Sequence, residues 1–328
     1  MTVAVTGASG VVGSEIVRTL SNNNIKTRSV IRSATNTGLL TPFKNSTEIA
    51  EADILDMAGL MKALEGADAV VHAAGFVSFN PRRKDQLHNI NVQGTQNVVN
   101  ACLANKIPKL VHISSVAAFG QPRDTKKINE NSRWESDRVT SDYSKSKYLS
   151  ELEVYRGQEE GLNVSIVNPS VVLSAGDGTR SSSRLLGYVW RQRQFYSNFN
   201  LNYVDARDVA EIVTRLLKGN FNGDRFIASA GSVPVKKVFQ LIADRFKKRA
   251  PGFHIPPALA KAAAQLEELR AVITGGEPVI TRQSVRLLRE DVLFENSKAK
   301  EVLGMEFQTL ENTLDWCCED FKTKNTNK

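Results

Sequence analysis

Short apolar segments alternate with segments of helical amphipathic pattern through the first half of the chain. The apolar runs, rich in Val and Ile, predict buried strands at Val3–Thr6, Thr27–Ile31, Ala69–His72, Leu110–Ser114 and Val164–Val167, with a weaker strand at Glu48–Glu51. Apolar positions with a period near 3.6 predict helices at Val11–Asn22, Met57–Leu64, Leu87–Ala104 and Asp142–Glu160. Such alternation is typical of an α/β fold, a doubly wound parallel sheet of the Rossmann type with helices on both faces.

The pattern changes after Pro169. A loop rich in Ser, Gly and Thr is followed by a predicted strand at Phe199–Val204, a helix at Ala206–Leu217 and a strand at Arg225–Ala228, and from Pro234 onward the pattern is mainly helical. We therefore expect two domains. Residues 1–170 and about 199–230 would bind a nucleotide, and residues of about 171–198 and 231–328 would form a smaller, mainly helical substrate domain.

Composition narrows the class of protein without naming its chemistry. The chain has 328 residues, of which 41% are hydrophobic and 24% charged, as in globular domains. No apolar run approaches the roughly 20 residues of a membrane span, so we expect no membrane partner. The net charge of +8 is scattered, without aromatic residues spaced among the basic ones, and a solvated surface is favoured over a nucleic-acid partner. Cys102, Cys317 and Cys318 suit neither disulfides nor a metal site, which favours a cytoplasmic location.

Three glycines follow the first predicted strand and precede a predicted helix. Gly7 can take the backbone angles of a tight turn, Gly10 lets the main chain approach a pyrophosphate, and Gly13 allows close helix–strand packing. The free N–H groups of the turn and helix start, at Ser9, Val11 and Val12, would then face the phosphates. A turn without a ligand is the alternative, but the flanking strand and helix favour nucleotide binding.

Tyr143 and Lys147 lie four residues apart, on one face of a predicted helix. A phenol with a pKa near 10 is a poor acid or base at neutral pH. A neighbouring ammonium would stabilise the phenolate and bring its pKa toward the working range. The alternative is an amphipathic surface helix. Ser114 and Ser115 end the strand before this helix, where a hydroxyl could bind a substrate oxygen or serve as an ordinary turn residue.

Taken in order, these residues resemble the extended short-chain dehydrogenase/reductase family, of the NAD-dependent epimerase/dehydratase type, over nearly the whole chain. The resemblance implies that Ser115, Tyr143 and Lys147 are catalytic and that Asn91 holds a water linking the lysine to solvent. It further implies that Ser114 lies near the nicotinamide, and that cofactor contacts come from the glycine turn and from Asp53, Ile54, Ala73, Ala74, Gly75 and Pro169, besides Tyr143 and Lys147. His72, before Ala73, could equally be a packed histidine. The family also implies a homodimer.

The end of the second predicted strand bears on the cofactor. It carries Arg32 and no Asp or Glu that could hold a ribose 2′-hydroxyl. A guanidinium suits a 2′-phosphate, because it binds phosphate through paired, charge-assisted hydrogen bonds. NADP(H) is therefore favoured over NAD(H), with a solvent-facing arginine as the alternative.

The substrate is less defined. Val116 and Ala117 follow Ser115 where dehydratases of the family carry acids, and the chain is closest in style to dihydroflavonol 4-reductases and 3β-hydroxysteroid dehydrogenases. The stretch from Gly178 to Val204 has no acidic residue; its arginines could meet an anionic substrate or coat an exposed helix: Arg180, Arg184, Arg191 and Arg193. Its aromatic residues could line an apolar pocket or pack in the core: Tyr188, Trp190, Phe195 and Tyr196.

The favoured hypothesis is an NADP(H)-dependent oxidoreductase that interconverts a carbonyl and a secondary alcohol of a small molecule. Tyr143 would give or take the proton, Lys147 would lower its pKa, and Ser115 would orient the oxygen. The alternative is a nucleotide-sugar epimerase with tightly bound NAD, which returns the hydride to the same substrate. A third hypothesis is a sensor that binds NADP without turnover.

Overall fold

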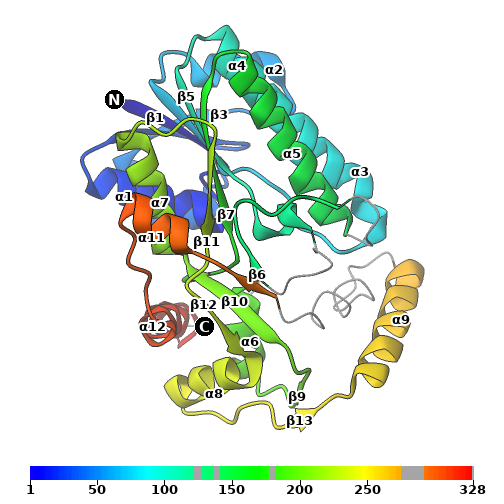
Figure 1. Ribbon diagram of the computed structural model, residues 1–328. Helices are drawn as coiled ribbons and strands as arrows, with labels where there is room; N and C mark the ends of the chain where they lie inside the picture. The colour runs from blue at the N-terminus through cyan, green and yellow to red at the C-terminus, as the bar shows by residue number, and fades with distance from the viewer. Residues whose placement is uncertain (121–126, 136–140, 177–181, 275–291, 327–328) are drawn as a thin grey trace.

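Seven parallel strands form the central sheet of the molecule (Figure 1). The computed structural model describes residues 1–120, 127–135, 141–176, 182–274 and 292–326. The strand order is β11-β7-β5-β4-β1-β2-β3, and every neighbouring pair is parallel. The strands are β1 (Thr2–Thr6), β2 (Lys26–Ile31), β3 (Glu48–Glu51), β4 (Ala69–His72), β5 (Lys109–Ile113), β7 (Asn163–Pro169) and β11 (Asp224–Ala228). The predicted doubly wound α/β fold is confirmed.

Helices cover both faces of this sheet (Figure 1). One face carries α1 (Val11–Asn22), α7 (Ala206–Lys218) and α11 (Ser297–Leu303). The other carries α2 (Met57–Leu64), α4 (Gly94–Ala104) and α5 (Asp142–Glu159). Alternate residues of a strand point to opposite faces, so Val3 and Val5 of β1 pack in the first layer while Ala4 packs in the second. This double burial explains why the strands are continuously apolar.

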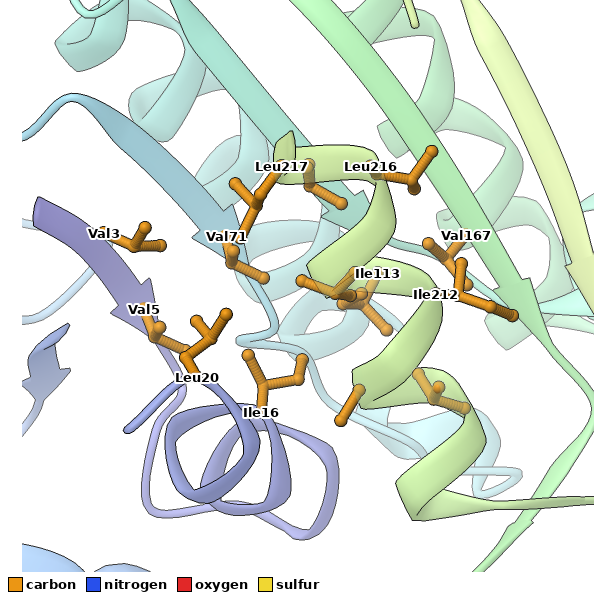
Figure 2. Packing of buried hydrophobic residues seen from close by; sticks show 14 of the residues in the cluster. Val3, Val5, Ile16, Leu20, Val71, Ile113, Val167, Ile212, Leu216 and Leu217 are labelled. Atoms are coloured by element: carbon orange, nitrogen blue, oxygen red, sulfur yellow. The ribbon is translucent and has the colours of Figure 1, made fainter. Parts of the chain in front are cut away.

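The first layer is the largest hydrophobic cluster of the sheet. Figure 2 shows Ile16 and Leu20 of α1 lying against Val5 of β1, with Ile212 and Leu216 of α7 beside the neighbouring strands. All five side chains are 0% exposed. The layer therefore fixes the start of α1, where the glycine turn lies, relative to the ends of the strands.

The predicted helix Leu87–Ala104 is interrupted. The structure has a short helix α3 (Lys84–Leu87), a π-helical segment η3 (His88–Gln93) and then α4. Single π-helical turns often occur at functional sites, because they reorient one side chain. Here the wider turn contains Asn91, which is buried. Hydrophobic periodicity does not record such an insertion.

A second lobe lies below the carboxyl end of the sheet (Figure 1). Its three-stranded sheet has the order β12-β10-β8, formed by β8 (Val171–Leu173), β10 (Asn200–Asp205) and β12 (Gly231–Pro234). The strand predicted at Phe199–Val204 is thus β10, and it pairs with β8 and β12 rather than with the seven-stranded sheet. The helices of this lobe are α6 (Ser183–Trp190), α8 (Val235–Phe246), α9 (Pro257–Thr274) and α12 (Leu310–Thr326).

Short elements complete the chain. Three 3₁₀-helical segments lie in the connections between elements: η1 (Gly38–Ser46), η2 (Pro81–Arg83) and η4 (Val116–Phe119). Two pairs of short parallel strands join distant segments, namely β6 (Lys127–Ile128) with β14 (Leu293–Phe294) and β9 (Phe195–Tyr196) with β13 (Phe253–His254). Within the described ranges, no helix is long and apolar enough to cross a membrane.

The packing of the first layer predicts a measurable stability difference. Leu20→Ala removes a side chain that is 0% exposed, and we expect the free energy of unfolding to fall by about 2–5 kcal/mol. Leu266→Ala on α9 is the matched control, because Leu266 is 69% exposed and its loss should change stability by less than about 0.5 kcal/mol. Urea denaturation compares the two. Equal losses would contradict this placement of α1.

Candidate active site

The glycine turn is built for close approach between chain segments. Gly7 has φ of +69°, and a Cβ at this position would lie 2.5 Å from the backbone nitrogen of Ala74. The turn is closed by the Gly10 N–H, which donates to the Gly7 carbonyl over 2.9 Å. A Cβ on Gly13 would clash with the same Gly7 carbonyl. Any side chain at Gly7 or Gly13 would therefore push β1, α1 and the end of β4 apart.

The start of α1 opens into the main pocket of the described residues. No side chain caps this helix, and its first turn leaves backbone N–H groups without an intrahelical acceptor. Val11 and Val12 line a cavity of about 500 Å³ that lies beyond the carboxyl ends of β1, β4, β5 and β7. Ligands of open parallel sheets bind in this position.

Three predicted catalytic residues meet in this cavity. Tyr143 and Lys147 reach it from α5, whose start is capped by the Ser141 hydroxyl accepting from the Ser144 N–H over 2.8 Å. Ser115 reaches it from the end of β5, and its hydroxyl also accepts from the Ala117 N–H over 3.2 Å.

Burial sets the protonation of the pair. It raises the pKa of Tyr143 above its usual value of 10, and a side-chain hydrogen bond with Ser115 partly opposes that rise. Burial also lowers the pKa of Lys147 to about 8, against the opposing charge of Glu151. The Lys147 ammonium donates to the Ile113 carbonyl over 3.0 Å. The expected lowering of the phenol pKa by the ammonium is therefore corrected: desolvation is the larger effect here, and the Tyr143 phenol is neutral at pH 7.

Asn91 lies beneath the cavity and holds its wall. Its Oδ1 accepts from the Phe76 N–H over 2.7 Å, and its Nδ2 donates to the Phe76 carbonyl and the Ser146 hydroxyl, each over 2.9 Å. Phe76 lines the cavity. The Asn91 side chain thus fixes the segment after Gly75 and ties it to α5.

The remaining predicted site residues divide into two groups. Ala73, Gly75, Ser114 and Pro169 line the cavity together with Val11 and Val12. The others lie around it without lining it: Gly7, Ser9, Gly10, Gly13, Arg32, Asp53, Ile54 and Ala74. Among these, Arg32 and Asp53 are exposed beyond β2 and β3, and the Asp53 carboxylate accepts from the Leu55 N–H over 2.9 Å.

His72 is a packed histidine of the interior, which is one of the two interpretations that the sequence allows. Its ring stacks on His112, with the ring centroids 5.2 Å apart, and is 0% exposed. Its Nδ1 and Nε2 pair with the hydroxyls of Thr6 and Thr95. Burial lowers the pKa of His72 to about 3, so the ring is neutral.

The outer part of the cavity is mainly apolar, with Asn200 and Asn202 of β10 as its amide side chains, and sequence patterning did not identify it. Its lining comes from segments far apart in the chain: Phe76, Val77, Phe79, Val116, Ile128, Phe199, Leu201, Val292 and Phe294. Only the pairing of β6 with β14, and the position of β10, bring these side chains together. Within the described part of the lining, Lys147 is the one charged residue.

The arginine-rich stretch contributes to a different region. Arg184, Arg191 and Arg193 are absent from the described lining, and Arg180 lies outside the described residues. The aromatic residues of the stretch mainly pack in the second lobe, as with Trp190 against Phe246, whose ring centroids are 5.1 Å apart. The three described arginines of the stretch therefore lie outside the described cavity lining.

Several features fit a dinucleotide. The turn at Gly7 and Gly13 has no room for side chains, and the open helix start offers N–H donors to a pyrophosphate. Farther along the cavity, the buried hydroxyl of Ser170 has no hydrogen-bond partner among the described residues. Buried polar atoms are seldom left unpaired, so a polar ligand group fits there.

Comparisons with known proteins agree with this geometry. Residues 3–227 match the NAD dependent epimerase/dehydratase family. A putative dihydroflavonol 4-reductase of Synechocystis sp. is 26% identical over 94% of this chain and 91% of its own. Sterol demethylase protein B of Methylococcus capsulatus is 26% identical over 93% of each chain. The crystal structure of UDP-glucose 4-epimerase from Thermotoga maritima with UDP-glucose has a TM-score of 0.81, covers both chains fully and shares 18% identity, a likeness of fold.

The family match spans the glycine turn, all seven strands of the sheet and the helix that carries Tyr143 and Lys147. These two relatives match almost end to end, so the sequence similarity extends over the second lobe as well. The chain therefore belongs to the NAD-dependent epimerase/dehydratase family and is an NAD(P)-dependent oxidoreductase of the extended short-chain dehydrogenase/reductase type.

Proposed function

We propose that the protein reduces the carbonyl group of an uncharged, largely apolar small molecule, with NADPH as the hydride donor, and catalyses the reverse oxidation. One observation carries this proposal. Ser115, Tyr143 and Lys147 face a cavity whose outer part is apolar, and its described lining contains no arginine or carboxylate. A charged substrate would lose its hydration there, and Lys147, which this proposal assigns to catalysis, is the one charged residue of the described lining.

The cofactor would lie along the carboxyl edge of the sheet and supply the hydride from its nicotinamide. Its pyrophosphate would bind the N–H groups of Val11 and Val12, and its adenine would lie toward Asp53 and Ile54. The backbone of Ala73–Gly75 would lie against its middle part. Ser114 and Pro169 would contact the nicotinamide, and Lys147 the neighbouring ribose.

In this arrangement the Ser115 hydroxyl orients the substrate oxygen and Tyr143 gives it a proton. The neutral phenol is the form required for reduction, and its raised pKa keeps it in that form. The Lys147 ammonium stabilises negative charge on the phenolate that remains. Asn91 acts as a positioning residue for Phe76 and α5, through the hydrogen bonds of its amide.

The alternative, a nucleotide-sugar epimerase with tightly bound NAD, uses the same three residues. The fold of UDP-glucose 4-epimerase supports it in general terms. Against it, a nucleotide sugar carries a pyrophosphate, and no arginine stands in the described lining to meet that group. A sensor that binds NADP without turnover has less support, because such a protein would not need the catalytic residues Ser115, Tyr143 and Lys147.

Further properties follow from the family and the packing. We propose a homodimer, as the resemblance implies, and a cytoplasmic location, with which the three buried free cysteines agree. We also propose two domains, supported by separate hydrophobic clusters around the main sheet and within the second lobe. Because β10 pairs within the second lobe, we place it with the substrate domain.

Replacement of the phenol tests the proton donor. Tyr143→Phe keeps the ring, whose centroid lies 5.9 Å from that of Phe79, and removes the acidic proton. We expect kcat for carbonyl reduction to fall at least about 100-fold, while the Kd for NADPH changes by less than about threefold. Stopped-flow NADPH oxidation and fluorescence titration measure the two. Near-normal turnover in this variant would overturn the mechanism.

The pKa of Lys147 predicts the shape of the pH profile. Because the active form is protonated and its pKa is about 8, kcat/KM for reduction should be level between pH 6 and 7. Above pH 8 it should fall, reaching about a tenfold loss per pH unit. Tyr143, with its pKa above 10, does not contribute to this decline. A profile that stays level to pH 10 would contradict the assignment.

Arg32 tests the choice of cofactor. Its side chain is exposed beside the end of β2, and the nearby Glu51 carboxylate is engaged by the Ala34 N–H over 2.9 Å. We expect Arg32→Ala to weaken NADPH binding about 10-fold or more and to leave NADH binding unchanged, since only NADPH has the 2′-phosphate. Lys26→Ala, an exposed cation at the opposite end of β2, is the control. Equal affinity of the wild type for both nucleotides would sink the proposal.

A further inference from the structure

A buried carboxylate lies one helical turn beyond Lys147 and outside the cavity. The Glu151 side chain is 2% exposed. Burial of an ionisable group is unfavourable unless bonds and opposite charges compensate for lost hydration. Glu151 is buried, so it does not contribute to the charged surface, and it is not among the residues that line the cavity. Its place in the interior therefore requires another explanation.

The Glu151 carboxylate connects α5 with the strand ends that carry the site. Its Oε1 accepts from Asn168 Nδ2 over 2.6 Å, and the same Nδ2 donates to the Ser115 carbonyl over 3.0 Å. Asn168 directly precedes Pro169 at the end of β7. Burial raises the pKa of this carboxyl, and hydrogen bonds from Ser114 and Asn168, together with the positive charges of Arg225 and Lys147, oppose that rise. Glu151 thus braces the backbone of Ser115 through a single amide.

The other carboxylate oxygen faces a cation that is itself held in place. Arg225 Nη1 of β11 lies 3.6 Å from Glu151 Oε2. The guanidinium donates to the Glu130 carbonyl over 2.8 and 2.6 Å and to the Ser132 carbonyl over 2.8 Å. It also stands 4.3 Å from the centre of the Phe119 ring. The carboxylate is therefore fixed at both of its oxygens.

Lys147 has fewer compensating interactions than Glu151. Its ammonium donates to the Ile113 carbonyl, and within the described chain no carboxylate forms an ion pair with it. Glu151 follows on the same face of α5, and its negative charge opposes the desolvation of Lys147. Charges in a protein interior are weakly screened, so this attraction acts without direct contact.

We propose that Glu151 is a positioning residue of the active site, whose fixed carboxylate keeps Lys147 charged and holds Ser115 in place through Asn168. The inference rests on the proposed role of Lys147 in reduction. It adds Glu151 as a second positioning residue beside Asn91, one that touches neither substrate nor cofactor. The chain carries it in the series Tyr143, Lys147 and Glu151, each four residues after the last.

The other titratable groups around Lys147 and Glu151 keep the same charge over the pH range of the test. His72 of β4 and His112 of β5 face Lys147, and burial lowers the pKa of both, to about 3 for His72, so that they stay neutral. Tyr155 of α5 interacts with Glu151, and burial raises its pKa above 10. Arg225 stays charged at every relevant pH.

The test is the pH profile of Glu151→Gln. The glutamine oxygen can still accept from Asn168, while the negative charge is lost. We expect the alkaline decline of kcat/KM to move down by about one pH unit, a loss of about fivefold at pH 8, with values at pH 6 within about twofold of the wild type. Glu151→Asp, which keeps the charge, should restore the decline to near its original position.

Controls separate this effect from a general structural one. Glu159→Gln makes the same change at an exposed position of α5 and should leave the profile unaltered. If Glu151→Gln does not fold, Glu151→Gln/Arg225→Met removes both partners of that ion pair, so that neither is left as an unpaired charge, and should still shift the decline downward. A uniform loss at all pH values, or an unshifted decline, would overturn the proposal. A wild type without an alkaline decline would instead contradict the proposed role of Lys147.

Discussion

The parallel arrangement of the central strands is the constraint on which the site depends. Every strand ends at the same edge, so residues that follow separate strands converge there although they are distant in sequence. The glycine turn follows β1, Ala73–Gly75 follow β4, Ser114 and Ser115 follow β5, and Pro169 ends β7. Both faces of the sheet are covered by apolar layers, and the cavity lies at this carboxyl edge.

Burial gives the converging polar groups their chemical properties. In water, Tyr143 and Lys147 would titrate within about half a unit of each other. In the interior, desolvation raises the pKa of the phenol and lowers that of the ammonium to about 8, so a neutral acid stands beside a cation at pH 7. Asn168, Arg225 and Glu151 form the polar layer beneath them. In the proposed function, the apolar outer cavity would select the substrate by excluding charge.

Much of this arrangement follows from local sequence. The helices Val11–Asn22 and Met57–Leu64 and the strand Ala69–His72 have the predicted limits, because each has a clear period and a clear break at both ends. The π-helical turn at Asn91 escaped prediction, since one inserted residue leaves most of the hydrophobic pattern intact.

Long-range pairing accounts for what the sequence left open. Glu151 carries a local signal, its spacing from Lys147, whereas its partner Arg225 is brought near only by the pairing of β11 with β7. The apolar cavity wall likewise needs β6 and β14 to meet. The arginines after Ser183 suggested an anionic substrate as one option, but α6 directs its aromatic residues into the second lobe's core and places none of these arginines in the described cavity lining.

The central claim is net hydride transfer from NADPH to an apolar carbonyl compound. Single-turnover reactions with NADPH deuterated at nicotinamide C4, in the presence of uncharged aryl ketones and aldehydes, test it most directly. The account predicts one equivalent of NADP⁺ and one deuterium on the new carbinol carbon. Interconversion of UDP-glucose and UDP-galactose by protein with retained NAD, without net change in the cofactor and with no reduction of the carbonyl panel, would contradict it.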